Sequence, residues 1–372
     1  MPLGPLAPEL VRATTFALPS AEMVRAVGMG EQPGEFYPRY GHPAGRRFEA
    51  GVAELEGADG AVAFASGMAV IHALFGTFCS AGDVVCAAND LYGGVSSLLR
   101  NYLPRLGITV RRFDPFDLKD MERTITGKVR LVHVETPINP TVRVVDLARV
   151  ARVAKAAGAL LSCDATFVPP PFQQVLRHGV DLAMHSATKF LGGHSDVLAG
   201  VVSGRHELVA QMEGFRRLTG AVLGPDAAWL LCRSLPTHVA RVRQQTATAR
   251  ELAGFLRERS GRVARVHYSG LPDHPDHAVA QRQMEGFGSV LSFEVPGGAA
   301  GAIRVYDRLK VIARAVSLGG VESVASLPIH TSHAHATAEE RQRAGIGEGL
   351  IRLSVGLEPG AVLRADLEQA LA

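Results

Sequence analysis

One lysine in this chain lies just beyond an apolar segment and is flanked by apolar side chains. Residues 182–185 predict a buried strand, and Lys189 follows it and precedes Phe190 and Leu191. Burial beside apolar side chains lowers the pKa of an ammonium group, which makes the amine available as a nucleophile. The same position also suits a lysine whose alkyl chain lies along the surface with its charge in water. The sequence alone leaves both interpretations open.

Other polar residues follow apolar segments in the same way. Tyr92, Asn139 and Asp164 each come shortly after an apolar segment that predicts a strand. In an open α/β sheet, the carboxyl ends of the parallel strands meet at one edge, and ligands bind there. We therefore expect these side chains and Lys189 to converge on a single site.

Asp164 has two candidate roles at its predicted strand end. A carboxylate in this place can pair with a buried cation, such as the protonated nitrogen of a pyridine ring. An aspartate can also cap a helix or stabilise a turn. The residue by itself does not decide between these roles.

Small and hydroxyl-bearing residues predict a place for a phosphate group. Ser66, Gly67 and Met68 form a turn between an apolar strand segment and an apolar helix. Backbone N–H groups at a helix start bind phosphate well, although many strand–helix turns share these residue types. Ser186 and Thr188 carry hydroxyl groups at alternate positions, so both can face the same phosphate.

The order of apolar segments predicts an α/β protein. Strand-like and helical segments alternate from residue 61 to residue 202, which indicates a mostly parallel sheet with helices on both faces. After Gly220, long helices and a few strands predict a smaller α+β domain. We expect an N-terminal arm at 1–45, a large domain at 46–235 and a C-terminal domain at 236–372.

Composition excludes several classes of partner. The 372 residues are 47% hydrophobic and carry a formal net charge of +3, which gives no electrostatic reason to expect nucleic acid or a membrane surface. We see neither a signal peptide nor an apolar segment long enough for a membrane helix. The four cysteines form no CxxC pair, so we expect a reducing, cytoplasmic compartment.

Histidines cluster twice in the sequence. The clusters are His330, His333 and His335, and His267, His274 and His277. Neither cluster has nearby cysteines or a spacing typical of zinc ligands, so we expect no metal site.

Several motifs resemble those of the Cys/Met-metabolism PLP-dependent enzyme family, where PLP is pyridoxal 5′-phosphate. The family includes cystathionine γ-synthase, cystathionine γ-lyase and methionine γ-lyase. The most specific motif is Ser-Ala-Thr-Lys-Phe-Leu-Gly-Gly-His-Ser-Asp at 186–196, which is similar to the family's lysine signature. Supporting motifs, in the family's order, are Tyr-Pro-Arg-Tyr-Gly-His-Pro at 37–43, Ser-Gly-Met-Ala at 66–69, Leu-Tyr-Gly-Gly at 91–94, Glu-Thr-Pro-Ile-Asn-Pro at 135–140, Ser-Leu-Gly-Gly-Val-Glu-Ser at 317–323 and Ile-Arg-Leu-Ser-Val-Gly-Leu-Glu at 351–358.

The resemblance implies the aspartate-aminotransferase type of fold (fold type I), PLP as the cofactor and a role for individual residues. Lys189 would form the Schiff base with PLP and carry protons, Tyr92 would stack on the ring and transfer a proton, and Asp164 would pair with the pyridine nitrogen. The implied cofactor-binding residues are Ser66, Gly67, Met68, Ser186 and Thr188, with Tyr37 and Arg39 supplied by a neighbouring subunit. The implied substrate-binding residues are Asn139, Ser317, Glu322 and Arg352.

The activity implied by the resemblance is γ-elimination from a sulfur amino acid such as cystathionine or methionine, giving a thiol, 2-oxobutanoate and ammonia. The implied assembly is a dimer that shares its active sites, within a tetramer. Two positions depart from family patterns. Ser97 stands where cystathionine-handling members carry an arginine, and Gly94 stands where typical methionine γ-lyases carry a cysteine. Arg100, one helical turn beyond Ser97, either replaces that arginine or faces solvent.

Several alternatives stay open. A γ-replacement synthase, such as cystathionine γ-synthase or an O-acylhomoserine sulfhydrylase, would use the same cofactor residues. A cofactor-free relative would have a broken lysine or phosphate site, and each of those positions is intact here.

Glu322 resembles the acidic residue of γ-specific members but also suits a surface glutamate at a helix start. Arg352, in an apolar strand, needs either a ligand anion or an internal salt bridge.

Overall fold

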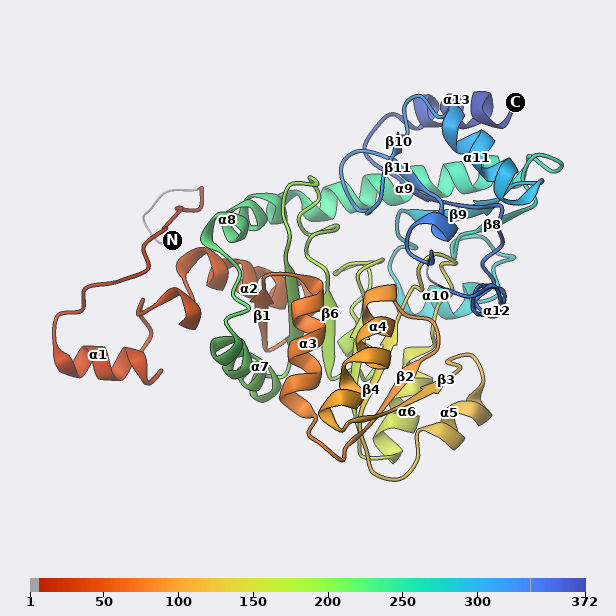
Figure 1. Cartoon of the computed structure of the whole chain (residues 1–372). Helices are drawn as coiled ribbons and strands as arrows, with labels where there is room; N and C mark the ends of the chain where they lie inside the picture. The colour runs from red at the N-terminus through yellow and green to blue at the C-terminus, as the bar shows by residue number, and fades with distance from the viewer. Residues whose placement is uncertain (1–6, 335) are drawn as a thin grey trace.

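The computed structural model of the chain describes residues 7–334 and 336–372. Two β-sheets with surrounding helices dominate it (Figure 1). Within the described residues, the larger sheet has seven strands in the order β1-β7-β6-β5-β4-β2-β3. Their bounds are Gly60–Phe64 (β1), Val84–Ala88 (β2), Thr109–Phe113 (β3), Val129–Glu135 (β4), Leu160–Asp164 (β5), Leu182–His185 (β6) and Gly200–Gly204 (β7).

The larger sheet is mostly parallel, as the alternating segments predicted. Strands β2 to β6 run parallel to one another, and only β7 is antiparallel to its neighbours β1 and β6. Strands β5 and β6 are almost entirely buried, which explains why most of their residues are apolar. The carboxyl ends of β2, β4, β5 and β6 therefore lie at the same edge of the sheet.

Helices cover both faces of this sheet. They are α2 (Pro43–Glu56), α3 (Gly67–Phe78), α4 (Gly93–Asn101), α5 (Leu118–Thr124), α6 (Leu147–Ala156), α7 (His206–Thr219) and α8 (Pro225–Ser234). On β1, Val62 and Phe64 pack in a core cluster with α3, whereas Ala63 packs in another cluster with α2 and α8. Because successive side chains of a strand point to opposite faces, α3 lies on one face of the sheet and α2 on the other.

A second, smaller sheet has the strand order β10-β11-β12-β9-β8. The strands are Arg265–His267 (β8), Val290–Glu294 (β9), Ala313–Arg314 (β10), Val324–Ser326 (β11) and Leu350–Ser354 (β12). The helices that follow α8 are His238–Arg257 (α9), His277–Gln283 (α10), Gly298–Arg308 (α11), Ala338–Arg343 (α12) and Gly360–Leu371 (α13). Helices α9, α11 and α13 pack with β9 and β12 in one apolar core, which is the α+β arrangement predicted for this region.

The long helix α9 runs beside both sheets (Figure 1). Its Val242 packs with Phe167 and Phe190 of the large sheet's loops, whereas its Ala249 and Leu252 pack in the core of the smaller sheet. The predicted border at residue 236 stays a prediction, and α9, which begins at His238, is the element that joins the two parts.

The N-terminal segment extends away from the rest of the chain and carries helix α1 (Ala21–Gly28) at its far end (Figure 1). Few of its contacts are with the large domain. One is the hydrogen bond from Trp229 Nε1 to the Pro8 carbonyl oxygen, at 2.7 Å. Helix α2 begins at Pro43, where His42 caps it. Among the described residues, the helices are too short or too polar to cross a bilayer.

Candidate active site

Lys189 lies in the loop after β6, and its amine is partly buried. Its Nζ donates a hydrogen bond to Ser317 Oγ at 2.6 Å. Burial, followed by the nearby Arg352 charge, lowers the pKa of Lys189 to about 8, while the Asp164 charge opposes the shift. This contact favours the buried-nucleophile interpretation over a lysine that lies along the surface.

Asp164 ends β5 and is held by a turn that sequence reasoning missed. Its Oδ1 accepts hydrogen bonds from the Thr166 backbone N at 3.0 Å and the Thr166 Oγ1 at 2.5 Å. The same Thr166 hydroxyl accepts one from the backbone N of Ser186 at 2.9 Å. Burial raises the pKa of Asp164, and the two Thr166 hydrogen bonds oppose that shift. The spacing Asp-x-Thr is the signal that could have revealed this turn.

The start of helix α3 faces the loop that carries Lys189. Ser66 caps this helix, because its Oγ accepts a hydrogen bond from Ala69 N at 3.1 Å. The first N–H groups of a helix, here those of Gly67 and Met68, have no acceptor within the helix. A methyl group on Gly67 would come within 3.1 Å of Ser186 Cβ, so this glycine leaves room beside the Ser186 hydroxyl. Thr188 uses its hydroxyl differently, in two hydrogen bonds to Ala199.

Tyr92 precedes helix α4, and its side chain is 47% exposed. A side chain on Gly94 would contact both the Tyr92 ring and Met68 Sδ, so these two residues lie close together. The backbone N of Tyr92 donates a hydrogen bond to Glu135 Oε2 at 2.6 Å, and Glu135 Oε1 accepts one from Asn139 N at 3.1 Å. Glu135 is the first residue of the motif at 135–140, but the sequence predicted no role for it.

Arg352 lies on β12 of the smaller sheet, and its side chain contacts a loop of the larger sheet at this site. It is only 6% exposed, and burial lowers its pKa to about 10. Its Nη1 donates to Asn139 Oδ1 at 3.0 Å and its Nη2 to the Ser317 carbonyl oxygen at 2.7 Å. Its Nε is buried without a hydrogen-bond partner among the described residues. Arg352 forms no salt bridge to any described carboxylate, so the internal-salt-bridge alternative is not observed.

The loop around Ser317 has an unusual backbone. Ser317 has a φ of 81°, a left-handed conformation that residues other than glycine adopt rarely. This conformation directs the Ser317 hydroxyl to Lys189 and its carbonyl to Arg352. Predicted residues Lys189, Asn139, Ser317 and Arg352 are therefore connected by hydrogen bonds.

Tyr37 and Arg39 lie on the N-terminal arm, outside this network. Arg39 is exposed in the N-terminal arm, where its Nη1 donates to the Arg217 carbonyl oxygen at 3.1 Å. Its guanidinium carbon lies 5.4 Å from the centroid of the Tyr37 ring. Within one chain, this pair contacts the end of α7 and not the surroundings of Lys189.

Glu322 and Arg100 have partners of their own. Glu322 accepts a hydrogen bond from the Ser195 hydroxyl, in the loop that follows Lys189. Arg100, the candidate replacement for an arginine at position 97, forms an ion pair with Glu340 of α12 at 3.2 Å. Its side chain is 66% exposed, which matches the solvent-facing alternative.

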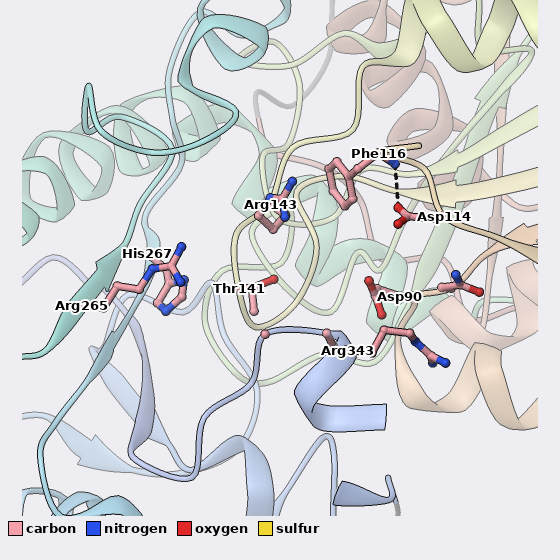
Figure 2. Close-up of a pocket in the computed structure, with 11 residues that line it drawn as sticks. Asp90, Asp114, Phe116, Thr141, Arg143, Arg265, His267 and Arg343 are labelled. Atoms are coloured by element: carbon pink, nitrogen blue, oxygen red, sulfur yellow. Dashed lines mark hydrogen bonds between the residues drawn. The ribbon is translucent and has the colours of Figure 1, made fainter. Parts of the chain in front are cut away.

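A polar cavity of about 200 Å³ adjoins this site between the two sheets (Figure 2). Arg143, Arg265 and Arg343 line it together with the carboxyl groups of Asp90 and Asp114. Asp90 lies two residues before Tyr92, and burial raises its pKa while the Arg343 charge opposes that shift. The cavity therefore gives the carboxyl edge of β2 and β3 a margin lined by charged side chains.

Several described histidines of the two clusters have other partners. Across the described residues, no group of three or more histidine, cysteine, aspartate or glutamate side chains is arranged to hold a metal ion. His267 instead pairs with Glu294 at 2.8 Å, and His277 hydrogen-bonds to the Ser269 carbonyl oxygen. His335 lies outside the described residues.

The residues present fit a phosphorylated pyridine aldehyde. An amine with a lowered pKa, a buried carboxyl group and a helix start surround the same sheet edge. The orphaned Nε of Arg352 can hydrogen-bond to the carboxylate of an amino acid. Together with the two-sheet architecture, these groups are those of a PLP-dependent enzyme of fold type I.

Comparison with known proteins identifies the family. The model of the Cys/Met metabolism PLP-dependent enzyme family matches residues 3–372, and the chain belongs to this family. O-succinylhomoserine sulfhydrylase of Pseudomonas aeruginosa is 40% identical over 371 residues, covering 100% of this chain and 92% of that protein. L-methionine gamma-lyase of Pseudomonas putida is 40% identical over 370 residues, covering 99% of this chain and 93% of that protein.

A solved structure agrees with the family assignment. The crystal structure of cystathionine gamma synthase from Xanthomonas oryzae pv. oryzae in complex with cystathionine has a TM-score of 0.92 and 36% sequence identity. The match covers 98% of this chain and 92% of that chain. The chain is thus a PLP-dependent enzyme of cysteine and methionine metabolism, with the predicted fold and cofactor confirmed.

Proposed function

We propose that this enzyme catalyses γ-elimination from a sulfur amino acid such as methionine or cystathionine. The observation that carries the proposal is the hydrogen-bonded chain Lys189–Ser317–Arg352–Asn139, which sets a basic amine beside a guanidinium suited to an α-carboxylate. The methionine γ-lyase relative supports elimination. For a thioether substrate, water is consumed and the products are a thiol, 2-oxobutanoate and an ammonium ion.

The proposed roles follow from what each side chain contacts. When bound, PLP supplies an electron sink for the charge that develops at the substrate α-carbon. Lys189 would hold the cofactor covalently until the substrate amine takes its place, and its freed Nζ would then accept the α-proton. Arg352 and Asn139 would orient the substrate carboxylate. Tyr92 would lie over the cofactor and donate a proton from its hydroxyl to the departing sulfur.

The other proposed contacts hold the cofactor. Asp164 would accept a hydrogen bond from the ring nitrogen through the oxygen that Thr166 leaves free. The phosphate would lie at the start of α3, against the N–H groups of Gly67 and Met68 and the hydroxyl of Ser186. Ser66 would act by capping that helix, and Thr188 by fixing the loop that carries Lys189.

A γ-replacement activity is the second candidate, favoured by the similarity to O-succinylhomoserine sulfhydrylase. Two assays separate the candidates. Release of 2-oxobutanoate is measured with methionine and with cystathionine, and thioether formation is measured with an acylhomoserine plus cysteine. Elimination as the main activity requires faster 2-oxobutanoate release than thioether formation at saturating substrate. The opposite order would replace the proposal with a synthase.

Cofactor attachment should depend on pH through Lys189. Only the free amine reacts with an aldehyde, and the pKa of Lys189 is lowered to about 8. The rate of reconstitution from apoenzyme and PLP should therefore rise about tenfold between pH 6 and 7 and level off above about pH 8. Stopped-flow absorbance measures this rate. A rate that keeps rising to pH 10 would contradict a lowered pKa.

We also propose that Tyr37 and Arg39 complete the site of a second copy of the chain. Both side chains are exposed on the extended arm, away from Lys189 of their own chain. A partner subunit that receives this arm would place a guanidinium beside its phosphate. The enzyme would then need at least a dimer for activity.

Mixing two inactive variants tests the shared site. After subunit exchange, Lys189→Ala and Arg39→Ala proteins should recover about a quarter of wild-type activity, because half of random dimers are mixed and each has one intact site. Mass spectrometry of the native dimers measures the exchange itself. Confirmed mixed dimers without recovered activity would show that each site uses one chain only.

A further inference from the structure

Glu135 ends β4 in the interior of the site, and it is almost fully buried. Two backbone N–H groups from different loops donate hydrogen bonds to its carboxyl group. Glu135 Oε2 accepts from Tyr92 N at 2.6 Å, and Glu135 Oε1 accepts from Asn139 N at 3.1 Å. One carboxyl group therefore ties the loop after β2 to the loop after β4.

The two loops carry residues that serve different parts of the proposed site. The Tyr92 ring lies next to Met68 at the start of α3, on the cofactor side. The Asn139 side chain accepts the hydrogen bond of Arg352 Nη1, on the substrate side. A shift of Glu135 would displace both backbones. Glu135 itself hydrogen-bonds to neither the Lys189 amine nor the Arg352 guanidinium.

Two other carboxyl groups lie near Glu135. Asp164 is its register partner on β5, and Asp90 lies in the loop after β2. Burial, followed by the charge of Asp164, raises the pKa of Glu135 to about 8, while its two backbone hydrogen bonds oppose the shift. His185 and Lys189 lower the pKa of Asp164. A negative charge on one of two neighbouring carboxyl groups disfavours ionisation of the other.

We propose that Glu135 is a positioning residue that holds Tyr92 and Asn139 together, and thereby sets the orientation of the cofactor ring and the place of the substrate carboxylate. The proposal rests on the assignment of the PLP site to the surroundings of Lys189. Because Glu135 is the register partner of Asp164 on the neighbouring strand, its charge would also affect the ring nitrogen that Asp164 is proposed to contact. Glu135 thus acts on both the geometry and the protonation of the site.

Two variants of the full-length holoenzyme separate these effects. Glu135→Ala removes both backbone hydrogen bonds, whereas Glu135→Gln keeps one acceptor oxygen and cannot titrate. Asp366→Asn is the matched control, because the Asp366 carboxylate accepts three backbone N–H groups at 2.9 Å in the other domain. The readouts are the visible circular dichroism of bound PLP, the L-methionine concentration that half-saturates the visible spectral change, and the pH dependence of the spectrum.

The expected results differ for each variant. Glu135→Ala should weaken the circular dichroism and raise the half-saturating methionine concentration about tenfold or more, since two hydrogen bonds are lost and each is worth roughly a fivefold effect. Glu135→Gln should give a smaller increase and a spectral pH midpoint below that of the wild type, because a negative neighbour is removed. Asp366→Asn should lower the unfolding temperature and leave the three readouts unchanged.

Two results would overturn the proposal. One is a Glu135→Ala protein with wild-type circular dichroism and methionine saturation. The other is an Asp366→Asn protein that changes these readouts as much as the Glu135 variants do. If Glu135→Ala does not fold, an unchanged pH midpoint and saturation in Glu135→Gln would be enough to reject the proposal. Wild-type protein that fails to attach PLP to Lys189 would instead reject the site assignment on which the proposal rests.

Discussion

Replacing Lys189 with alanine is expected to lower kcat/KM by on the order of 10⁴-fold, because one amine both attaches the cofactor and accepts the α-proton. The loss should not come from unfolding, because Lys189 hydrogen-bonds a single side chain, that of Ser317. Lys155→Ala is the matched control, since Lys155 is an exposed lysine of α6 in the same domain. That control should keep wild-type activity.

The site of covalent attachment gives a second, activity-independent measurement. Borohydride reduction of the wild-type holoenzyme, followed by peptide mass spectrometry, should find the pyridoxyl group on Lys189. The Lys189→Ala protein should give no labelled lysine in the same experiment. A label on another lysine, or a Lys189→Ala protein within tenfold of wild-type activity, would remove the basis of the proposed mechanism.

Replacing Arg352 with leucine is expected to lower kcat/KM by about 10²-fold or more, mainly through a higher KM. Arg352 is buried and keeps an Nε without a partner, so an incoming carboxylate gains a charge-assisted hydrogen bond that leucine cannot offer. Arg352→Lys should recover only part of the loss, because an ammonium group cannot reproduce the planar guanidinium contacts to Asn139 and Ser317.

The Arg352 variants carry their own controls. Arg314→Leu, at an exposed position on β10 of the same sheet, should not affect KM. Removal of the Arg352 charge should also raise the pKa of Lys189, since this charge helps to lower it. The pH profile of cofactor attachment should then move to higher pH. A normal KM in Arg352→Leu would show that another group holds the substrate carboxylate.

Much of the site could be predicted from where apolar segments end. Asp164 and Lys189 follow two strands that are adjacent and parallel in the sheet, so the rule that strand ends converge placed them together. Arg352 could also be singled out, because a guanidinium within an apolar strand needs an anion or polar partners. The motifs of the family added Ser317, which no local pattern would have selected.

The residues that sequence reasoning missed act through hydrogen bonds that spacing does not reveal. Glu135 accepts two backbone N–H groups, and one of them belongs to Tyr92, 43 positions away in the sequence. Thr166 bridges Asp164, the last residue of β5, and Ser186, which directly follows β6. Such contacts depend on the register between strands, and one sequence does not specify that register.

The roles of Arg100 and the arm also depended on tertiary structure. Helical spacing put Arg100 one turn beyond Ser97, but spacing could not say that Glu340 of a distant helix would neutralise it. For Tyr37 and Arg39, the sequence predicted a contribution to another subunit, which is a property of an assembly. Their positions on an extended arm are compatible with that prediction, which the mixing experiment tests.

Arg352 lies on the smaller sheet, and its hydrogen-bond partner Asn139 lies in a loop of the larger sheet. The proposed recognition of the amino acid therefore requires residues of both parts of the chain. Consider a chimaera in which only the last third of the chain comes from a relative. Its arginine at the position of Arg352 would come from the relative, whereas the loop that it contacts would come from this chain. Transfer of substrate preference between relatives should therefore require the loop at 135–140 and the segment around Ser317 to be moved as a single unit. A new substrate specificity that evolves in this fold should likewise require changes in both of these segments.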